Sequence, residues 1–265
     1  MTNAATIYAI DDIHGQKAML DHALALIEAD GGPDAQIMFL GDYTDRGPDS
    51  RAVIDTLIDG QNAGRNWTCL MGNHDRMFAR FIQNGTEHDA RIKSGLSWLN
   101  PRLGGSTTLS SYGLDGTMHF EDPTADGLER LAHFEGDAGW IDKNALAAQA
   151  RAAIPTTHLA FLEGLPLYHQ TDDLIFVHAG LRMELPLEWQ DPEDLLWIRD
   201  GFLDSKINYG KLIVHGHTAL DHPQHFGNRV DLDGGAGYGR PLIPAVFEGR
   251  DCWLLTDDGR VPLVP

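Results

Sequence analysis

Three times near its amino terminus, the chain passes from a short apolar segment through a polar turn into an amphipathic stretch. Short apolar runs followed by segments with apolar residues three and four apart indicate strands alternating with helices. This alternation predicts an α/β fold with a largely parallel sheet and helices on its faces. In such sheets ligands bind at the carboxyl ends of the strands, where the polar turns fall. The expected strands are residues 6–10, 36–40 and 67–71, and the expected helices are 16–29, 48–61 and from 76 onward.

The middle of the chain lacks this rhythm. Gly, Ser and Thr cluster at residues 104–111, and Ala-rich stretches follow. We interpret residues 81–162 as a mostly helical insertion that covers one rim of the site, within a single domain spanning 1–265. Strands return at 174–177 and 211–214, and short segments near Val230, 245–247 and 253–255 are expected to form antiparallel pairs that add a second sheet.

The net charge of −19 argues against a nucleic-acid or membrane partner, because phosphodiesters and anionic lipids repel an acidic surface. No apolar stretch approaches the roughly 20 residues of a membrane helix. Residues 1–5 have no basic segment, so we expect no signal peptide and a cytoplasmic protein. The two cysteines, Cys69 and Cys252, have apolar neighbours and are expected to be buried thiols.

Side chains that can bind metal ions follow five of the expected strands. A single histidine after a strand is more often a hydrogen-bonded structural residue than a ligand, but five such strand ends together point to a metal centre. Carboxylate, imidazole and amide ligands suit Mn, Fe or Zn better than Mg or Ca. The residues are Asp12 and His14, Asp42 and Asp45, Asn73 and His74, His178, and His215 and His217.

The order and spacing of these residues resemble the phosphoprotein phosphatase family within the calcineurin-like metallophosphoesterases, in its bacterial serine/threonine phosphatase form. The matching blocks are DDIHG at 11–15, GDYTDRG at 41–47 and GNHD at 72–75, followed by HAG at 178–180 and GHT at 216–218. The resemblance implies a β-sandwich flanked by helices. One departure is Asp11, where the family usually has Gly and where a further negative charge would stand close to the metals.

The resemblance also implies a role for each residue. Two divalent ions, Mn first and Fe or Zn as alternatives, would share a hydroxide that attacks phosphorus directly. Asp45 is expected to support His74 and keep it protonated. By this resemblance Asp12 and His14 hold the first metal, Asp42 bridges both, Asn73, His178 and His217 complete the second, His74 is the general acid, and Arg46 and Arg199 bind the phosphate.

Three functions follow as alternatives. The first is a phosphomonoesterase that acts on phosphorylated protein or on small phosphoesters. The second is a dinucleoside tetraphosphate hydrolase, although such enzymes tend to differ at Asp45 and Thr218. The third is a non-catalytic scaffold, which would be expected to lack some ligands. Purely structural interpretations remain for single residues. Asp42 and Asp45 could cap a helix, Arg46 could form a surface ion pair, and His215 could be a structural histidine.

Overall fold

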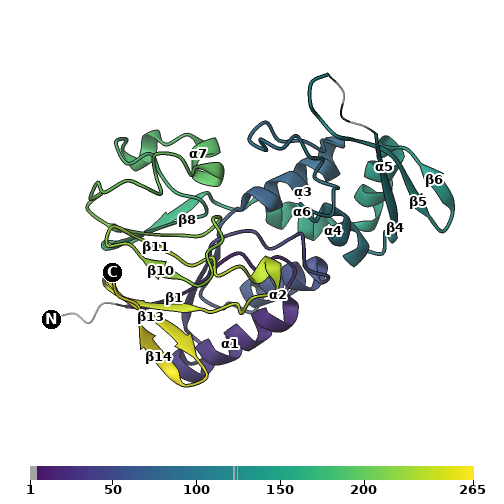
Figure 1. Cartoon of the computed structure of the whole chain (residues 1–265). Helices are drawn as coiled ribbons and strands as arrows, with labels where there is room; N and C mark the ends of the chain where they lie inside the picture. The colour runs from purple at the N-terminus through teal and green to yellow at the C-terminus, as the bar shows by residue number, and fades with distance from the viewer. Residues whose placement is uncertain (1–4, 122, 124) are drawn as a thin grey trace.

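The computed structural model describes residues 5–121, 123 and 125–265, and its centre is formed by two sheets packed face to face (Figure 1). The first sheet has the order β14-β13-β12-β1-β2-β3 and the second has the order β10-β11-β9-β8-β7. The first contains β1 (Thr6–Ile10), β2 (Gln36–Phe39), β3 (Trp67–Cys69), β12 (Ala245–Glu248), β13 (Asp251–Thr256) and β14 (Gly259–Pro262). The second contains β7 (Tyr168–Gln170), β8 (Leu174–Val177), β9 (Leu212–His215), β10 (Gln224–His225) and β11 (Arg229–Asp231).

The predicted parallel strands are confirmed, and so is the antiparallel pairing of segments 245–247 and 253–255. The expectation that these segments add a second sheet is wrong. Strands β1, β2 and β3 run parallel, as do β8, β9 and β11. Strands β12, β13 and β14 do not form a separate sheet. Instead β12 pairs antiparallel with β1, and the other two extend the first sheet beyond it. Without β12, β1 would be an edge strand with unpaired backbone N–H and C=O groups.

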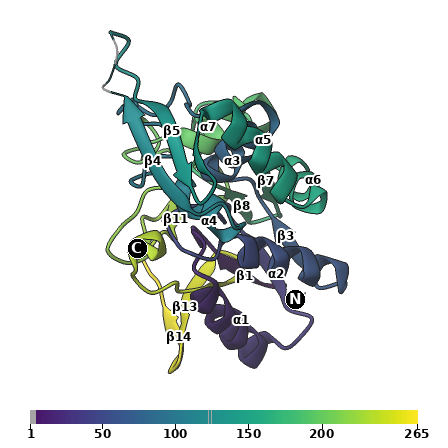
Figure 2. The ribbon, with the colours of Figure 1, turned by 90° about the vertical axis from the view of Figure 1, so that its right-hand side faces the viewer.

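Strand β1 shows how the sandwich divides its side chains. Ile7 and Ala9 face the core between the sheets, whereas Tyr8 and Ile10 face the helices. Helices α1 (Lys17–Gly31) and α2 (Ser50–Asn62) belong to this outer layer, whereas α3 (Asn73–Asn84) packs against helices of the insertion (Figure 2). Helix α7 (Pro192–Trp197) packs on the far side of the second sheet, where Leu195 and Ile175 belong to the same buried cluster. The predicted β-sandwich flanked by helices is therefore confirmed.

The insertion contains more strand than the sequence indicated. Its helices are α4 (Gly105–Ser111), α5 (Lys143–Ala153) and α6 (Thr156–Glu163). Between α4 and α5 in the sequence lies an antiparallel sheet, which was not predicted. It consists of β4 (Gly116–Glu121), β5 (Arg130–Gly136) and β6 (Gly139–Ile141). The register of β4 and β5 shifts between His119 and Phe120. This irregularity disturbs the alternation of apolar and polar residues by which a strand is identified.

The cysteines and the lengths of the helices bear on two further expectations. Cys69 and Cys252 are free, buried thiols, as predicted. In the described part of the chain, no helix is both long enough and apolar enough to cross a membrane. The expected absence of a signal peptide concerned residues 1–5, of which all but Ala5 lie outside the described residues.

Candidate active site

The predicted ligands lie at the carboxyl ends of β1, β2, β3, β8 and β9, and the fold brings them together. Each is buried, with exposed fractions between 0 and 8%. Potential donor atoms of Asp42, His178 and His217 lie within 4.8 Å of one another, as do those of His14, Asp42 and His74. Asp42 therefore belongs to two neighbouring donor groups, one on the β1 side and one on the β8–β9 side.

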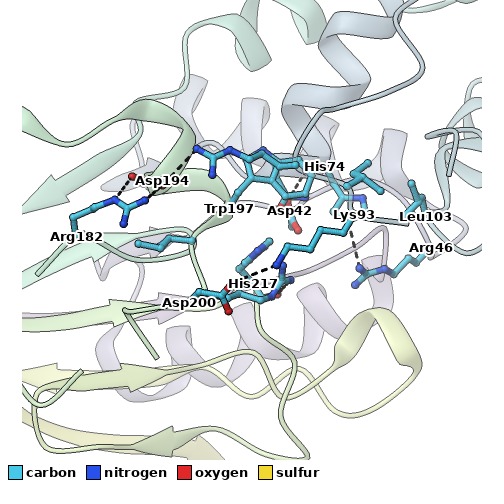
Figure 3. Close-up of a pocket in the computed structure, with 15 residues that line it drawn as sticks. Asp42, Arg46, His74, Lys93, Leu103, Arg182, Asp194, Trp197, Asp200 and His217 are labelled. Carbon is cyan, nitrogen blue, oxygen red and sulfur yellow. Dashed lines mark hydrogen bonds and ion pairs between the residues drawn. The ribbon is translucent and has the colours of Figure 1, made fainter. Parts of the chain in front are cut away.

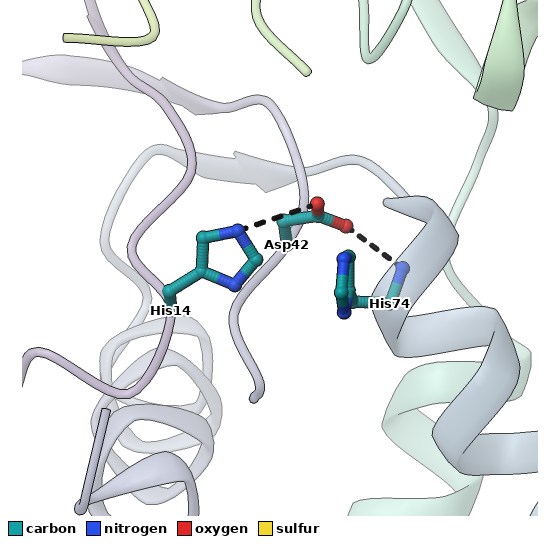
Figure 4. A group of neighbouring side chains, drawn as sticks. All are labelled: His14, Asp42 and His74. Carbon is teal, nitrogen blue, oxygen red and sulfur yellow. Dashed lines mark hydrogen bonds and ion pairs between the residues drawn. The ribbon is translucent and has the colours of Figure 1, made fainter. Parts of the chain in front are cut away.

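The carboxylate of Asp42 occupies the middle of the site (Figure 4). Its Oδ2 atom lies 3.6 Å from His14 Nε2 and 3.6 Å from His178 Nε2. Its Oδ1 atom accepts a hydrogen bond from the backbone N–H of His74 at 2.9 Å. One oxygen is thus held by the start of α3, while the other faces imidazoles from both donor groups. This is the position that a bridging carboxylate requires.

The imidazoles present suitable nitrogens. His14 Nδ1 lies 2.7 Å from the Thr44 carbonyl oxygen, and His178 Nδ1 lies 3.0 Å from that of Leu40. Because a carbonyl only accepts, each Nδ1 carries the proton and each Nε2 presents a lone pair. His14 Nε2 faces Arg46 Nη1 at 2.6 Å, and His178 Nε2 faces Asn73 Oδ1 at 2.8 Å. His217 Nε2 is buried and has no hydrogen-bond partner among the described residues. Such an orphaned nitrogen fits a metal ligand.

Electrostatics favour cations at this place. Burial raises the pKa of Asp12 and of Asp42 well above the usual range, and neighbouring carboxylates raise both further. Burial lowers the pKa of His178 to about 3 and that of His14 well below its usual value. Neutral imidazoles bind metals, and buried carboxylates need a positive partner. The residues present therefore fit two divalent ions of the Mn, Fe or Zn type.

The backbone at the site is strained. In the described ranges, the non-glycine residues with positive φ are all predicted site residues, with φ between 39° and 73°. Nearby glycines allow the close approach that these loops need. A Cβ on Gly72 would lie 2.1 Å from the backbone nitrogen of Asp42. Strained residues cluster where the fold holds a precise arrangement of groups. The residues are Asp12, His14, Asp42, Asp45, Arg46 and His217.

His74 and Asp45 form a buried pair beside the donor groups. His74 Nδ1 lies 2.6 Å from Asp45 Oδ2, so Nε2 is the atom that faces the cleft. The protonation of His74 by way of Asp45 in the working site stays a prediction. Burial lowers the pKa of His74, and the opposing effect of Asp45 does not overcome it. A phosphate dianion beside the ring would raise this pKa again.

Two arginines reach the site without carboxylate partners. Arg46 Nη1 lies 2.6 Å from His14 Nε2, and its Nη2 lies 3.3 Å from His74 Nε2. Arg199 Nη2 donates to the carbonyl oxygen of His217 at 3.1 Å. Neither guanidinium forms an ion pair with a carboxylate of the described residues, so Arg46 is not the surface ion-pair residue considered above. Both are available to bind an anion.

A cleft of about 500 Å³ opens over these groups (Figure 3). The predicted ligands that line it are Asp42, Asn73 and His217. The insertion lines one side through residues 91–93 and Leu103. The cleft therefore gives a substrate access to these three predicted ligands, to His74 and to both arginines.

Asp11 and His215 lie next to the site but differ in their surroundings. Asp11 is 3% exposed, and neither carboxylate oxygen has a hydrogen-bond donor in the described part of the chain. A Cβ on Gly216 would lie 1.3 Å from Asp11 Oδ2, so this carboxylate requires glycine there. His215 Nε2 lies 3.0 Å from Nη1 of Arg229, outside the donor groups. This contact agrees with a structural role.

Sequence reasoning missed two residues that contact Asp45. Trp98 Nε1 and Thr108 Oγ1 both donate to its carboxylate, at 2.7 Å each. Both side chains come from the insertion, where no motif marked them. A tryptophan and a threonine carry no metal-binding or acid–base signature, so only the three-dimensional contact identifies them.

The comparisons with known proteins agree with this site. The chain belongs to the calcineurin-like phosphoesterase family, whose model matches residues 5–241. An asymmetrical bis(5'-nucleosyl)-tetraphosphatase of Geobacillus thermodenitrificans is 24% identical over 260 residues, covering 88% of this chain and 86% of that protein. A symmetrical bis(5'-nucleosyl)-tetraphosphatase of Janthinobacterium sp. is 40% identical over 70 residues, covering 26% and 24%.

Solved structures show the same fold. A crystal structure described as that of a candidate diadenosine tetraphosphatase superimposes with a TM-score of 0.60 at 19% identity, covering 98% of this chain and 95% of that one. A cold-active protein-tyrosine phosphatase of a psychrophilic Shewanella gives 0.55 at 15% identity, covering 98% and 81%. At these identities the likeness concerns the fold alone.

Proposed function

We propose that this chain is a phosphomonoesterase that holds two divalent metal ions, with Mn as the preferred ion, and removes phosphate from phosphoserine or phosphothreonine. The observation that carries the proposal is the position of Asp42 Oδ2, 3.6 Å from imidazole nitrogens of both donor groups. A carboxylate between two sets of neutral imidazoles is suited to bridging two cations.

The side chains divide the work. Asp12 and His14 would hold one ion, Asn73, His178 and His217 would hold the other, and Asp42 would be shared by both. When bound, the two ions supply positive charge for the phosphate oxygens and an ionised water as nucleophile. Arg46 and Arg199 bind the remaining phosphate oxygens, because a guanidinium offers planar paired donors.

His74 supplies the proton. As the bond between phosphorus and the ester oxygen breaks, the proton on His74 Nε2 passes to the leaving alkoxide. Asp45 fixes the ring through Nδ1, so Nε2 stays directed toward the cleft. The bound phosphate raises the pKa of His74 and thereby provides the protonated form that burial disfavours.

A second candidate function is hydrolysis of dinucleoside tetraphosphates. The names of the relatives favour it, and so do three cationic side chains in the cleft beyond the metal site, Arg91, Lys93 and Arg182. These cations already have acidic partners. Arg182 lies 2.6 Å from Asp194, and Lys93 lies 3.3 Å from Asp200. A polyphosphate chain would compete with those carboxylates, whereas a single phosphate needs only Arg46 and Arg199.

A substrate panel tests the proposal. The Mn-loaded protein would be assayed with a phosphoserine peptide, p-nitrophenyl phosphate and diadenosine tetraphosphate. Phosphate release from the first two, with a higher kcat/KM for the peptide than for the dinucleotide, supports the monoesterase. A higher kcat/KM for the dinucleotide would instead support hydrolysis of dinucleoside tetraphosphates. No turnover of any of the three with both ions bound would contradict a catalytic function.

A further inference from the structure

The carboxylate of Asp45 is held by the insertion as well as by His74. Trp98 Nε1 donates to Oδ2 at 2.7 Å, and Thr108 Oγ1 donates to Oδ1 at 2.7 Å. The Thr108 hydroxyl also accepts the backbone N–H of Asp45 at 2.8 Å. All three side chains are completely buried. Both carboxylate oxygens are therefore fixed by donors that lie outside the metal-binding loops.

The same oxygen serves Trp98 and His74. Asp45 Oδ2 accepts from His74 Nδ1 at 2.6 Å and from the indole N–H at 2.7 Å. Rotation of the carboxylate would break the bonds of both oxygens at once. Because no water reaches this buried group to replace a lost donor, the cost of rotation is high. The orientation of the imidazole thus depends on the two residues of the insertion.

The indole is held by the helix that carries His74. Its ring packs against Phe78 at a centroid distance of 5.8 Å and against Phe81 at 5.0 Å. Both phenylalanines belong to α3, whose second residue is His74. The ring, the carboxylate and the imidazole therefore form one closed unit. Replacement of Trp98 by Phe would preserve most of the packing and remove the hydrogen-bond donor.

We propose that Trp98 and Thr108 are positioning residues that act through Asp45 to direct His74 toward the leaving group. The inference rests on the proposed function, because it assigns His74 the transfer of a proton to the ester oxygen. It gives the insertion a part in the reaction in addition to its place at the side of the cleft. Neither residue lines the cleft.

The test compares leaving groups. Trp98→Phe and Thr108→Val should each lower kcat for a phosphoserine peptide by about ten-fold, the effect of one lost hydrogen bond to a charged group. Turnover of p-nitrophenyl phosphate should stay within about two-fold, since p-nitrophenolate departs without a proton. The Mn content should equal that of the wild type. Thr108→Ser should restore the peptide activity, because it returns the hydroxyl.

Matched controls separate positioning from general damage. Trp140→Phe changes a tryptophan of the same insertion that is 73% exposed, and it should leave both substrates unaffected. If Trp98→Phe does not fold, the Thr108→Val and Thr108→Ser pair gives the answer alone. Equal slowing of both substrates, or no slowing of either, would overturn the inference.

His74→Asn, measured in parallel, distinguishes a failure of the positioning role from a failure of the proposed proton transfer. If His74→Asn slows the peptide selectively but the Trp98 and Thr108 variants do not, the positioning role alone is wrong. If His74→Asn shows no dependence on the leaving group, the proposed proton transfer is wrong, and the positioning role fails with it. A selective loss in all three variants supports both.

Discussion

Asp42 accepts the backbone N–H of His74 through Oδ1 at 2.9 Å, and this bond ties the central carboxylate to the helix that carries the proposed acid. Asp42→Asn keeps the shape and an oxygen that can accept this bond, but it removes the negative charge. We expect the variant to lose both ions, whereas Asp12→Asn should lose only one. Elemental analysis after dialysis measures this difference. Wild-type metal content in Asp42→Asn would show that the carboxylate is not a shared ligand.

Removal of the ions should abolish turnover, and Mn should restore it better than Ca. Three of the proposed ligands are imidazoles, His14, His178 and His217, and Ca binds oxygen ligands in preference to nitrogen. The measurement is p-nitrophenyl phosphate hydrolysis by chelator-treated protein with each ion added back. Full activity in protein shown to contain no metal would contradict the two-ion site.

Arg46→Ala should weaken phosphate binding while leaving metal content intact. Loss of a hydrogen bond to a charged group costs about 1.5–3 kcal/mol, or roughly ten- to a hundred-fold in affinity. Inhibition by inorganic phosphate reports the change directly. Arg182→Ala is the matched control, since Arg182 lines the same cleft but is already paired with Asp194. Equal inhibition constants in wild type and Arg46→Ala would remove Arg46 from the phosphate site.

His74→Asn should separate binding from proton transfer. The variant should keep both ions and most of its affinity for substrate, because His74 is not among the six proposed ligands. General acid catalysis contributes typically about 10²–10⁴-fold, and most of this range should be lost with phosphoserine peptide. Little should be lost with p-nitrophenyl phosphate. The ratio of kcat for the two substrates tests the general-acid role of His74. A loss of metal in the variant would instead indicate that His74 is a metal ligand.

His215 should make the metal-free protein less stable in mild acid. Burial, helped by the positive charge of Arg229, lowers its pKa from 6.5 to about 3 in the folded state. The neutral ring therefore contributes stability that is fully present above pH 6.5 and is lost as the pH falls toward 3. Between pH 6.5 and 5 the loss should reach about 2 kcal/mol. His215→Gln should lack this component, so urea unfolding at both pH values should show a shallower dependence in the variant than in the wild type.

The sequence was sufficient to predict the site residues that follow closely on a strand. Asp12, Asp42, Asn73, His178 and His217 follow apolar strands directly, and parallel strands bring their carboxyl ends together. The motif residues were therefore expected to converge before any contact was known. The chemistry of their side chains then indicated the metal class.

Other features of the fold and the site depend on contacts between residues far apart in the sequence, which local sequence patterns do not predict. Strand β12 joins the first sheet because Thr6 pairs with Glu248, at the opposite end of the chain. The hydrogen bonds of Asp45 with Trp98 and Thr108 span 53 and 63 residues. The lowered pKa of His74 follows from burial, which sequence reasoning about its carboxylate partner did not weigh. Pairing of distant edges and depth of burial are properties of the completed fold.

The left-handed backbone conformations at the site also set how this protein responds to selection. Five of the six are Asp or His, residue types that adopt positive φ more readily than most, and the sixth is Arg46, whose φ is 64°. Each such conformation costs about 1–3 kcal/mol, and glycine would relieve that cost. A search for heat-resistant variants that scored folding alone would therefore favour glycine at these positions. It would discard proposed ligands and Arg46, the proposed phosphate-binding residue, first, so thermostability in this chain has to be sought away from the ends of its parallel strands.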